Sequence, residues 1–234
     1  MMIGMQRLAW IAWVSLAVAV GGCAVSRDAV RRAYETAQPC CETLAQLRYE
    51  KLPAQGPALF DIDERSPLFA FDTGRSFVLA VELPPLKPPY VVRIKSFALG
   101  DHIKESHIFF PAVLVLDERH AVLSRHVPPP SVSLRTADFT EATTENRWGL
   151  GLKLEWDLPI EHPAARYLVV HTTAEALAMA QKHRVPRFVP MILPGLVTTL
   201  PTGQEEVVEV PHSAFGRISL RVLPSALGQT GAPQ

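Results

Sequence analysis

The chain has 234 residues, of which 48% are hydrophobic and 20% are charged. This composition is that of a globular protein and excludes wholesale disorder. Its 23 basic residues balance its 23 acidic residues, so the sequence lacks the excess of positive charge by which proteins bind nucleic acid.

Residues 1–22 form a predicted signal peptide. Arg7 supplies a positive charge, residues 8–20 are apolar, and two glycines precede Cys23. The apolar run is too short to span a bilayer comfortably. Residues 20–23, read as V-G-G-C, resemble the lipobox of bacterial lipoproteins, in which the cysteine is lipidated and becomes the first mature residue. The alternative is plain secretion, with cleavage near Gly22 and a free Cys23.

Lipidation of Cys23 would anchor the protein to a membrane. Several acyl chains on one residue hold a protein firmly, whereas one chain alone binds only marginally. Ala24 follows the cysteine where an Asp would favour the inner membrane, so the resemblance to lipoproteins implies the outer membrane. We therefore expect a lipid-anchored protein that faces the periplasm.

Residues 23–50 are predicted to form a partly helical tether. Apolar residues recur with approximate helical spacing from Val30 until Pro39 breaks the pattern. Cys40 and Cys41 follow. Neighbouring Cα atoms lie about 3.8 Å apart, below the usual range for a disulfide, so a bridge within the pair would be strained. A redox-active or intermolecular link and a merely structural pair both remain open.

Residues 51–224 are predicted to form an antiparallel β-sandwich, followed by a disordered tail over residues 225–234. Short apolar or alternating runs separated by prolines predict strands, and the chain has no strand–helix–strand rhythm. The predicted strands cover residues 58–62, 68–71, 77–83, 90–99, 109–117, 120–126, 131–135, 148–156 and 166–171, with a closing hairpin of 205–210 and 217–223.

The run at residues 109–117 predicts a central strand. Apolar residues occupy both of its alternating faces, which is typical of a strand covered by protein on both sides, and residues 120–126 follow as its hairpin partner. One short helix is predicted over residues 172–184, because Thr172 and Glu175 have the spacing of a capping box and Pro186 ends the pattern. Residues 186–203 are predicted to be an irregular crossing.

The sequence contains no motif of a known catalytic or cofactor site, such as a nucleophile elbow, a P-loop or a dinucleotide fingerprint. We therefore predict no catalytic residue, no cofactor and no metal site. His102 and His107 are five positions apart, on opposite faces of a strand, which favours surface and packing roles over metal binding.

Two sets of residues would suit a carbohydrate ligand. A glycan hydrolase needs a pair of carboxylates, which Asp61, Asp63 and Glu64, or Asp157 and Glu161, could supply, although acidic residues at strand ends are usually just solvated. Aromatic rings can stack on sugar rings. Trp148 and Trp156 share a strand face with three leucines, which predicts burial in the core, and Tyr90 and Tyr167 are weaker candidates.

Two blocks together indicate a family. The first is F-x-P-x-V-L-V-L-D over residues 109–117, and the second runs from Tyr167 through Val170, Thr172 and Thr173 to Leu177. Together they resemble the maltose operon periplasmic protein family over about residues 40–223, with residues 218–222 in the place of a C-terminal strand. The chain differs from better-known members in its lipobox and in stopping after the β domain.

The resemblance implies a secreted envelope protein of maltose and maltodextrin uptake, without assigned enzymatic activity or catalytic residues. We therefore expect a non-enzymatic accessory in carbohydrate uptake that binds maltodextrin or an envelope transport protein. One alternative is a structural envelope module with no sugar ligand, and another is a glycan hydrolase.

Overall fold

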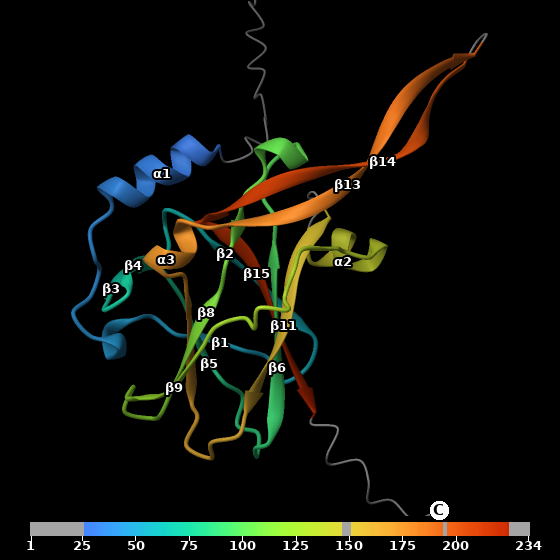
Figure 1. Cartoon of the computed structure of the whole chain (residues 1–234). Coiled ribbons are helices and arrows are strands. Elements are labelled where there is room, and N and C mark those ends of the chain that lie inside the picture. The colour runs from blue at the N-terminus through green and yellow to red at the C-terminus, as the bar shows by residue number, and fades with distance from the viewer. Residues whose placement is uncertain (1–25, 147–150, 194–195, 225–234) are drawn as a thin grey trace, which may run out of the picture.

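The computed structural model describes residues 26–146, 151–193 and 196–224. Two five-stranded sheets pack face to face as a β-sandwich (Figure 1), which confirms the predicted fold class. The first sheet has the order β1 (Glu50–Lys51), β5 (Leu79–Glu82), β12 (Tyr167–His171), β8 (Ala112–Leu116), β9 (Val122–His126). The second has the order β10 (Arg135–Thr136), β11 (Leu152–Ile160), β6 (Tyr90–Phe97), β15 (Gly216–Pro224), β2 (Pro57–Ile62).

Smaller elements complete the described chain. A hairpin joins β3 (Leu68–Phe71) to β4 (Gly74–Phe77), and a three-stranded sheet has the order β13 (Ala180–Leu193), β14 (Leu196–Ser213), β7 (Ile108–Phe109). The α-helices are α1 (Arg27–Thr36), α2 (Phe139–Thr144) and α3 (Ala174–Leu177), and the 3₁₀ helices are η1 (Leu44–Gln46) and η2 (Ile103–Glu105).

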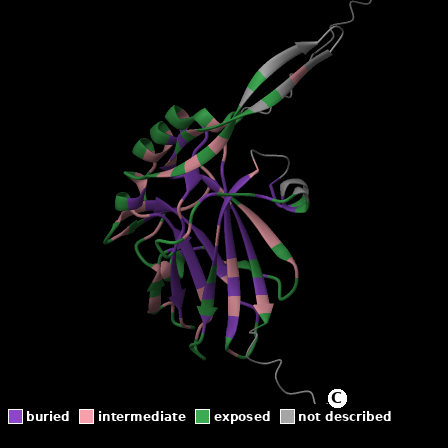
Figure 2. Cartoon of the chain, turned by 45° about the vertical axis from the view of Figure 1, so that its right-hand side comes forward, coloured by how far each residue is buried: buried purple, intermediate pink, exposed green. Residues whose placement is uncertain are grey.

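Strand β8 is buried on both faces, as the sequence predicts. Val113 and Val115 belong to the core cluster between the two sheets, while Leu114 and Leu116 belong to a second cluster that residues of the 41–49 segment cover. Buried residues dominate the sandwich strands (Figure 2). The predicted continuous strand at 109–117 is wrong in one respect, because β7 and β8 are separate and Pro111, which lacks an N–H donor, lies between them.

Helix α1 confirms the helix expected in residues 23–50, and it packs on the sandwich. Val30 is buried in the main core, and the hydroxyl of Tyr34 donates to the carbonyl oxygen of Arg75 at 2.8 Å. The Arg27 side chain donates to the backbone oxygens of Lys104 and Ser106 at 2.8 and 2.7 Å. The start of the described chain is therefore fixed beside η2. The predicted signal peptide and tail, residues 1–22 and 225–234, lie outside the described residues.

Helix α2, which the sequence analysis did not predict, covers the outer face of the second sheet. Asp138 caps it, accepting from the backbone N–H of Glu141 at 2.8 Å. The Glu141 carboxylate binds Lys95 and Lys153, and Glu145 binds Lys95 at 3.0 Å. All four residues are buried. The helix is thus seated on a buried cluster of two cations and two carboxylates.

The predicted helix over residues 172–184 is wrong beyond its first turn. Helix α3 ends at Leu177, and its cap is Thr173, whose hydroxyl accepts from the backbone N–H of Ala176 at 3.0 Å, not Thr172. From Ala180 the chain pairs with β14 instead. Only a few apolar positions carried the helical period, and pairing with a distant strand outweighed that local preference.

Two further predictions at the C-terminal end are corrected. The predicted irregular crossing at 186–203 is wrong for its described residues, 186–193 and 196–203, which lie in a long β-hairpin made by β13 and β14 that projects from the sandwich (Figure 1). Prolines are tolerated there because a two-stranded hairpin has outward edges that need no donor. The predicted hairpin of 205–210 with 217–223 does not form, because β15 instead lies between β6 and β2.

Candidate functional site

The two sequence blocks that suggested a family are neighbouring strands. Tyr167 in β12 is the register partner of Leu116 in β8, and Leu168 is that of Val115. The first block ends and the second block begins at the same end of these two strands, where Asp117 follows β8 and Tyr167 begins β12. The side chains at this end form the candidate site.

Asp117 shapes the turn that places His120 there. Its Oδ1 atom accepts from the backbone N–H groups of Arg119 and Ala121, both at 2.8 Å. His120 takes a φ of 61°, a left-handed conformation that is uncommon for a residue other than glycine. Its ring stacks on Tyr167 with the ring centres 4.5 Å apart and the planes 10° from parallel.

Tyr49 completes what we call the aromatic platform, namely Tyr49, His120 and Tyr167. The Tyr49 ring centre lies 4.6 Å from that of Tyr167 and 5.0 Å from that of His120. All three residues are half-buried, so part of the cluster faces solvent. Partly exposed aromatic side chains can stack against an apolar ring surface.

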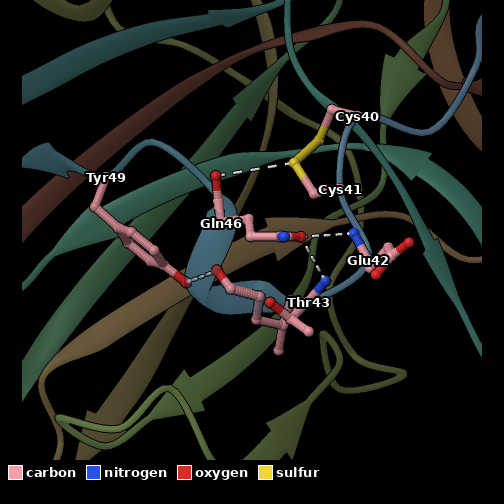
Figure 3. The surroundings of a disulfide bond; sticks show 7 residues. Cys40, Cys41, Glu42, Thr43, Gln46 and Tyr49 are labelled. Atoms are coloured by element: carbon pink, nitrogen blue, oxygen red, sulfur yellow. Dashed lines mark hydrogen bonds between the residues drawn. A yellow bond between two sulfur atoms is a disulfide. The ribbon is translucent and has the colours of Figure 1, made fainter.

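The segment before Tyr49 holds it in place (Figure 3). The Tyr49 hydroxyl donates to the carbonyl oxygen of Leu44 at 2.9 Å. Gln46 turns this segment back on itself, because its Oε1 atom accepts from the backbone N–H groups of Glu42 and Thr43 at 2.8 and 3.1 Å. The platform thus depends on a short, internally bonded loop.

Cys40 and Cys41 form a disulfide at the start of this loop, with their Cα atoms 3.8 Å apart. The Cys40 N–H donates to the carbonyl oxygen of Leu68 in β3 at 2.8 Å, and the Cys41 sulfur lies 3.9 Å from the carbonyl oxygen of Gln46 (Figure 3). The pair is therefore bonded within the chain and takes part in docking the loop. This arrangement supports the structural interpretation over an intermolecular link, and it leaves a redox role as a prediction.

The Tyr49 hydroxyl of the platform forms its hydrogen bond in the neutral, protonated state. Burial, followed by the proximity of Tyr167, raises the pKa of Tyr49 well above its ordinary value, so its hydroxyl stays protonated. Glu82 is the register partner of Tyr167 and pairs with Arg166 at 2.5 Å. A flat aromatic surface beside a charged, hydrogen-bonding pair can bind a ligand that has both an apolar face and hydroxyl groups.

None of the predicted carboxylate candidates belongs to the platform. Asp61 and Asp63 line a cleft of about 420 Å³ between the edges of the two sheets, with Arg48, Glu50 and Arg65. Burial would raise the pKa of Asp63, but hydrogen bonds from Arg65 outweigh it and lower that pKa below its ordinary value. A glycosidase acid needs a raised pKa, so Asp63 is poorly suited to that role.

The remaining carboxylate candidates, Asp157, Glu161 and Glu64, lie in three different surroundings. Asp157 on β11 accepts from the Arg93 side chain at 2.8 and 3.0 Å. Glu161 lines a separate hollow with His126 and His162. Glu64 is exposed in the turn after β2.

The histidine candidates flank η2 and do not share a strand. His102 is exposed before this turn, and His107 is buried after it. Across residues 26–146, 151–193 and 196–224, no group of three or more His, Cys, Asp or Glu side chains is arranged to hold a metal ion.

The aromatic candidates divide into core and surface residues. Trp156 and Tyr90 are buried in the main core, as expected for Trp156, while Trp148 lies outside the described residues. Of the three predicted aromatics that the structure describes, Tyr167 reaches the site. Sequence reasoning missed Tyr49 and His120, because they approach Tyr167 only after distant segments fold together. The acidic residue directly after the strand, Asp117, was the available signal for a specific turn.

The predicted lipidation site, Cys23, lies outside the described residues. Among the described residues, no helix is both long and apolar enough to cross a membrane.

Comparison with known proteins gives one match. The model of the family described as maltose operon periplasmic protein precursor (MalM) matches residues 73–222, which include both sequence blocks and two of the three platform residues. No curated protein and no solved structure matches the chain. Since the matched region covers more than half of the sequence, the chain belongs to the maltose operon periplasmic protein family.

Proposed function

We propose that the protein is an outer-membrane lipoprotein, anchored through Cys23 and facing the periplasm, that assists maltodextrin uptake without catalysing a reaction. The family match over residues 73–222 carries this proposal, because the family is one of periplasmic maltose-operon proteins. The aromatic platform is the surface on which we place the glycan.

The platform suits a glucose polymer for two reasons. Its half-buried rings offer faces to the apolar side of a pyranose, and Glu82 and Arg166 offer an acceptor and planar donors for hydroxyl groups beside them. Its position supports the same conclusion. Asp117 and Tyr167, which belong to the two family blocks, meet at this site although they are far apart in sequence.

Calorimetric titration of the full-length lipoprotein in detergent with maltodextrins tests the glycan proposal. We expect Tyr167→Ala to weaken binding about tenfold, since aromatic contacts contribute about 0.5–1.5 kcal/mol beyond their buried area. Tyr167→Phe keeps the ring and should bind nearly as well as the unchanged protein. Melting curves of both variants show whether the fold is retained. No heat at millimolar sugar would instead favour a structural envelope module.

The anchor is tested separately by labelling growing cells with a fatty-acid analogue. The unchanged chain should incorporate label at Cys23, and Cys23→Ser should incorporate none. Equal labelling of both chains would contradict lipidation at this residue.

A further inference from the structure

The outer half of the β13–β14 hairpin has an unusual composition. Residues 188–193 and 196–204, which we call the distal arm, contain no Asp, Glu, Lys, Arg or His. They include eight large apolar residues, namely Phe188, Val189, Met191, Ile192, Leu193, Leu196, Val197 and Leu200. The proximal part differs, since Arg184 pairs with Glu205 at 3.3 Å and Lys182 with Glu209 at 3.9 Å. Charged side chains therefore occur in the proximal part of the hairpin and are absent from the distal arm.

Two apolar side chains of the distal arm, Val189 and Leu200, face solvent. Val189 and Leu200 are register partners across the hairpin, so they lie on the same face, and they are 48% and 45% exposed. The hairpin extends beyond the sandwich (Figures 1 and 2). Exposed apolar surface at such a projection indicates a contact with another apolar phase.

The base of the hairpin lies next to the start of the described chain. Arg27 donates to the backbone oxygens of Lys104 and Ser106 in and after η2, and Lys104 pairs with Glu206 of β14 at 2.8 Å. Cys23 precedes Arg27 by four residues, which span at most about 14 Å. Residues 196–206 of β14 span roughly 33 Å at about 3.3 Å per residue. A lipid on Cys23 would therefore hold the membrane within reach of the distal arm.

We propose that the distal arm inserts into the surface of the lipid bilayer and acts as a second membrane contact beside the lipid on Cys23. This inference rests on the lipid anchor of the proposed function. The several acyl chains on Cys23 would hold the protein at the membrane by themselves. The arm fixes how the sandwich is oriented, which a flexible acyl anchor does not.

Insertion is confined to the boundary between headgroups and acyl chains. A two-stranded hairpin has outward backbone groups that hydrocarbon cannot hydrogen-bond, so it cannot cross the bilayer core. Pro190 and Pro201 each remove one N–H donor from the distal arm. The same prolines disfavour pairing of another strand along the arm, so a lipid surface fits better than a second copy of the chain.

The charges at the base of the arm are balanced between its two strands. Lys182 and Arg184 on β13 are paired with Glu209 and Glu205 on β14. We therefore expect insertion to depend on apolar contact. It should need no anionic lipid and should change little with added salt.

The test places a fluorescent probe on the full lipidated chain reconstituted in phosphatidylcholine vesicles. Leu200→Cys carries an environment-sensitive NBD probe on the distal arm, and Val122→Cys, at a 39%-exposed position on β9, carries it on the sandwich as a matched control. Lipids bearing a nitroxide on the acyl chain should quench the probe at residue 200 several-fold more than the probe at 122. Adding Val189→Glu should reduce quenching at 200 while the protein stays on the vesicles.

Other results would overturn the proposal. Equal quenching at the two positions, with fatty-acid label present on Cys23, shows that the arm stays outside the lipid. Self-quenching of the probe at 200 that rises with protein density shows a contact between copies instead. If no fatty-acid label is found, lipidation of Cys23 is disproved, but insertion of the arm is not yet tested. The unanchored chain is then mixed with the same vesicles, and absence of quenching at 200 refutes insertion.

Discussion

Lys95 balances the charges that lie beneath α2. It contacts Glu141 and Glu145 at 2.7 and 3.0 Å while its side chain is only 9% exposed. Lys95→Met leaves two buried carboxylates with less compensation, so we expect it to lower the free energy of unfolding by about 3–5 kcal/mol. Urea denaturation measures this.

Lys104 is the matched control for this change. It also binds a glutamate at 2.8 Å, but its side chain is 67% exposed. Lys104→Met should cost less than about 1 kcal/mol, because water screens exposed pairs. Equal losses of unfolding free energy at the two positions would contradict the idea that burial determines how much the cluster stabilises the fold.

Asp117 is expected to act on the glycan through His120. Asp117→Ala removes the acceptor of two backbone hydrogen bonds and should cost about 1–3 kcal/mol. Released from its left-handed conformation, His120 loses its fixed stacking on Tyr167, so maltodextrin affinity should fall as well. Asp72→Ala is the control, since the Asp72 side chain is 96% exposed. Calorimetry on both variants decides the point.

The burial of a single residue was predictable from the sequence where one local pattern determined it. The alternation around Trp156 indicated its burial, and the run at 109–117 indicated strand residues covered on both faces. The platform was not predictable in the same way. Tyr49, His120 and Tyr167 come from a loop, a turn and a strand, and the pairing of β8 with β12 and the docking of the 41–49 segment bring them together.

At the scale of elements, α2 makes stability depend on pH. Burial would raise the pKa of Glu141, but hydrogen bonds from Lys153 and Lys95 outweigh it and lower that pKa to about 2, against 4.5 in the unfolded chain. Between these values the unfolded chain binds more protons, so acidification favours unfolding. The contribution is complete above pH 4.5 and is lost as the pH falls toward 2.

Urea denaturation from pH 6 to pH 2 checks this dependence. The unchanged protein should lose stability across the window below pH 4.5. Glu141→Gln should be less stable at pH 6 and show a flatter profile. Parallel profiles for the two proteins would contradict a role for this carboxylate.

The arm should be dispensable for folding. Its residues pair between β13 and β14, away from the three core clusters. Replacing residues 188–204 with a two-residue Asn-Gly turn should therefore leave the melting temperature nearly unchanged. A large drop, seen by circular dichroism, would show that the arm supports the sandwich.

Local periodicity in the sequence correctly predicted whether a segment is a helix or a strand where the tertiary pairing agreed with it. Strand β6, predicted from its alternation, and β9, predicted as a hairpin partner, lie near their predicted positions. Residues 180–193 were wrongly predicted because their neighbours carried a brief helical period and their partner strand lay beyond a proline-rich turn. Helix α2 was missed because it depends on a polar cap at Asp138 and a charge cluster on another element, not on an apolar stripe.

For the whole molecule, Leu114 tests whether both faces of the first sheet are needed. It is 2% exposed in the cluster beneath the 41–49 segment. Leu114→Asp places a carboxylate in apolar surroundings and should prevent folding. Val122→Asp, on the exposed part of β9, should be tolerated. A folded and soluble Leu114→Asp protein would show that this strand is not central.

The position of β15 bears on the order of events during export. Because the last described strand lies between β6 and β2, β2 cannot join the second sheet until the chain has been supplied through residue 224. Contacts so distant in sequence form slowly. A chain passing through a narrow secretion channel would thus remain threadable until β15 has passed, and the sandwich could close only after that.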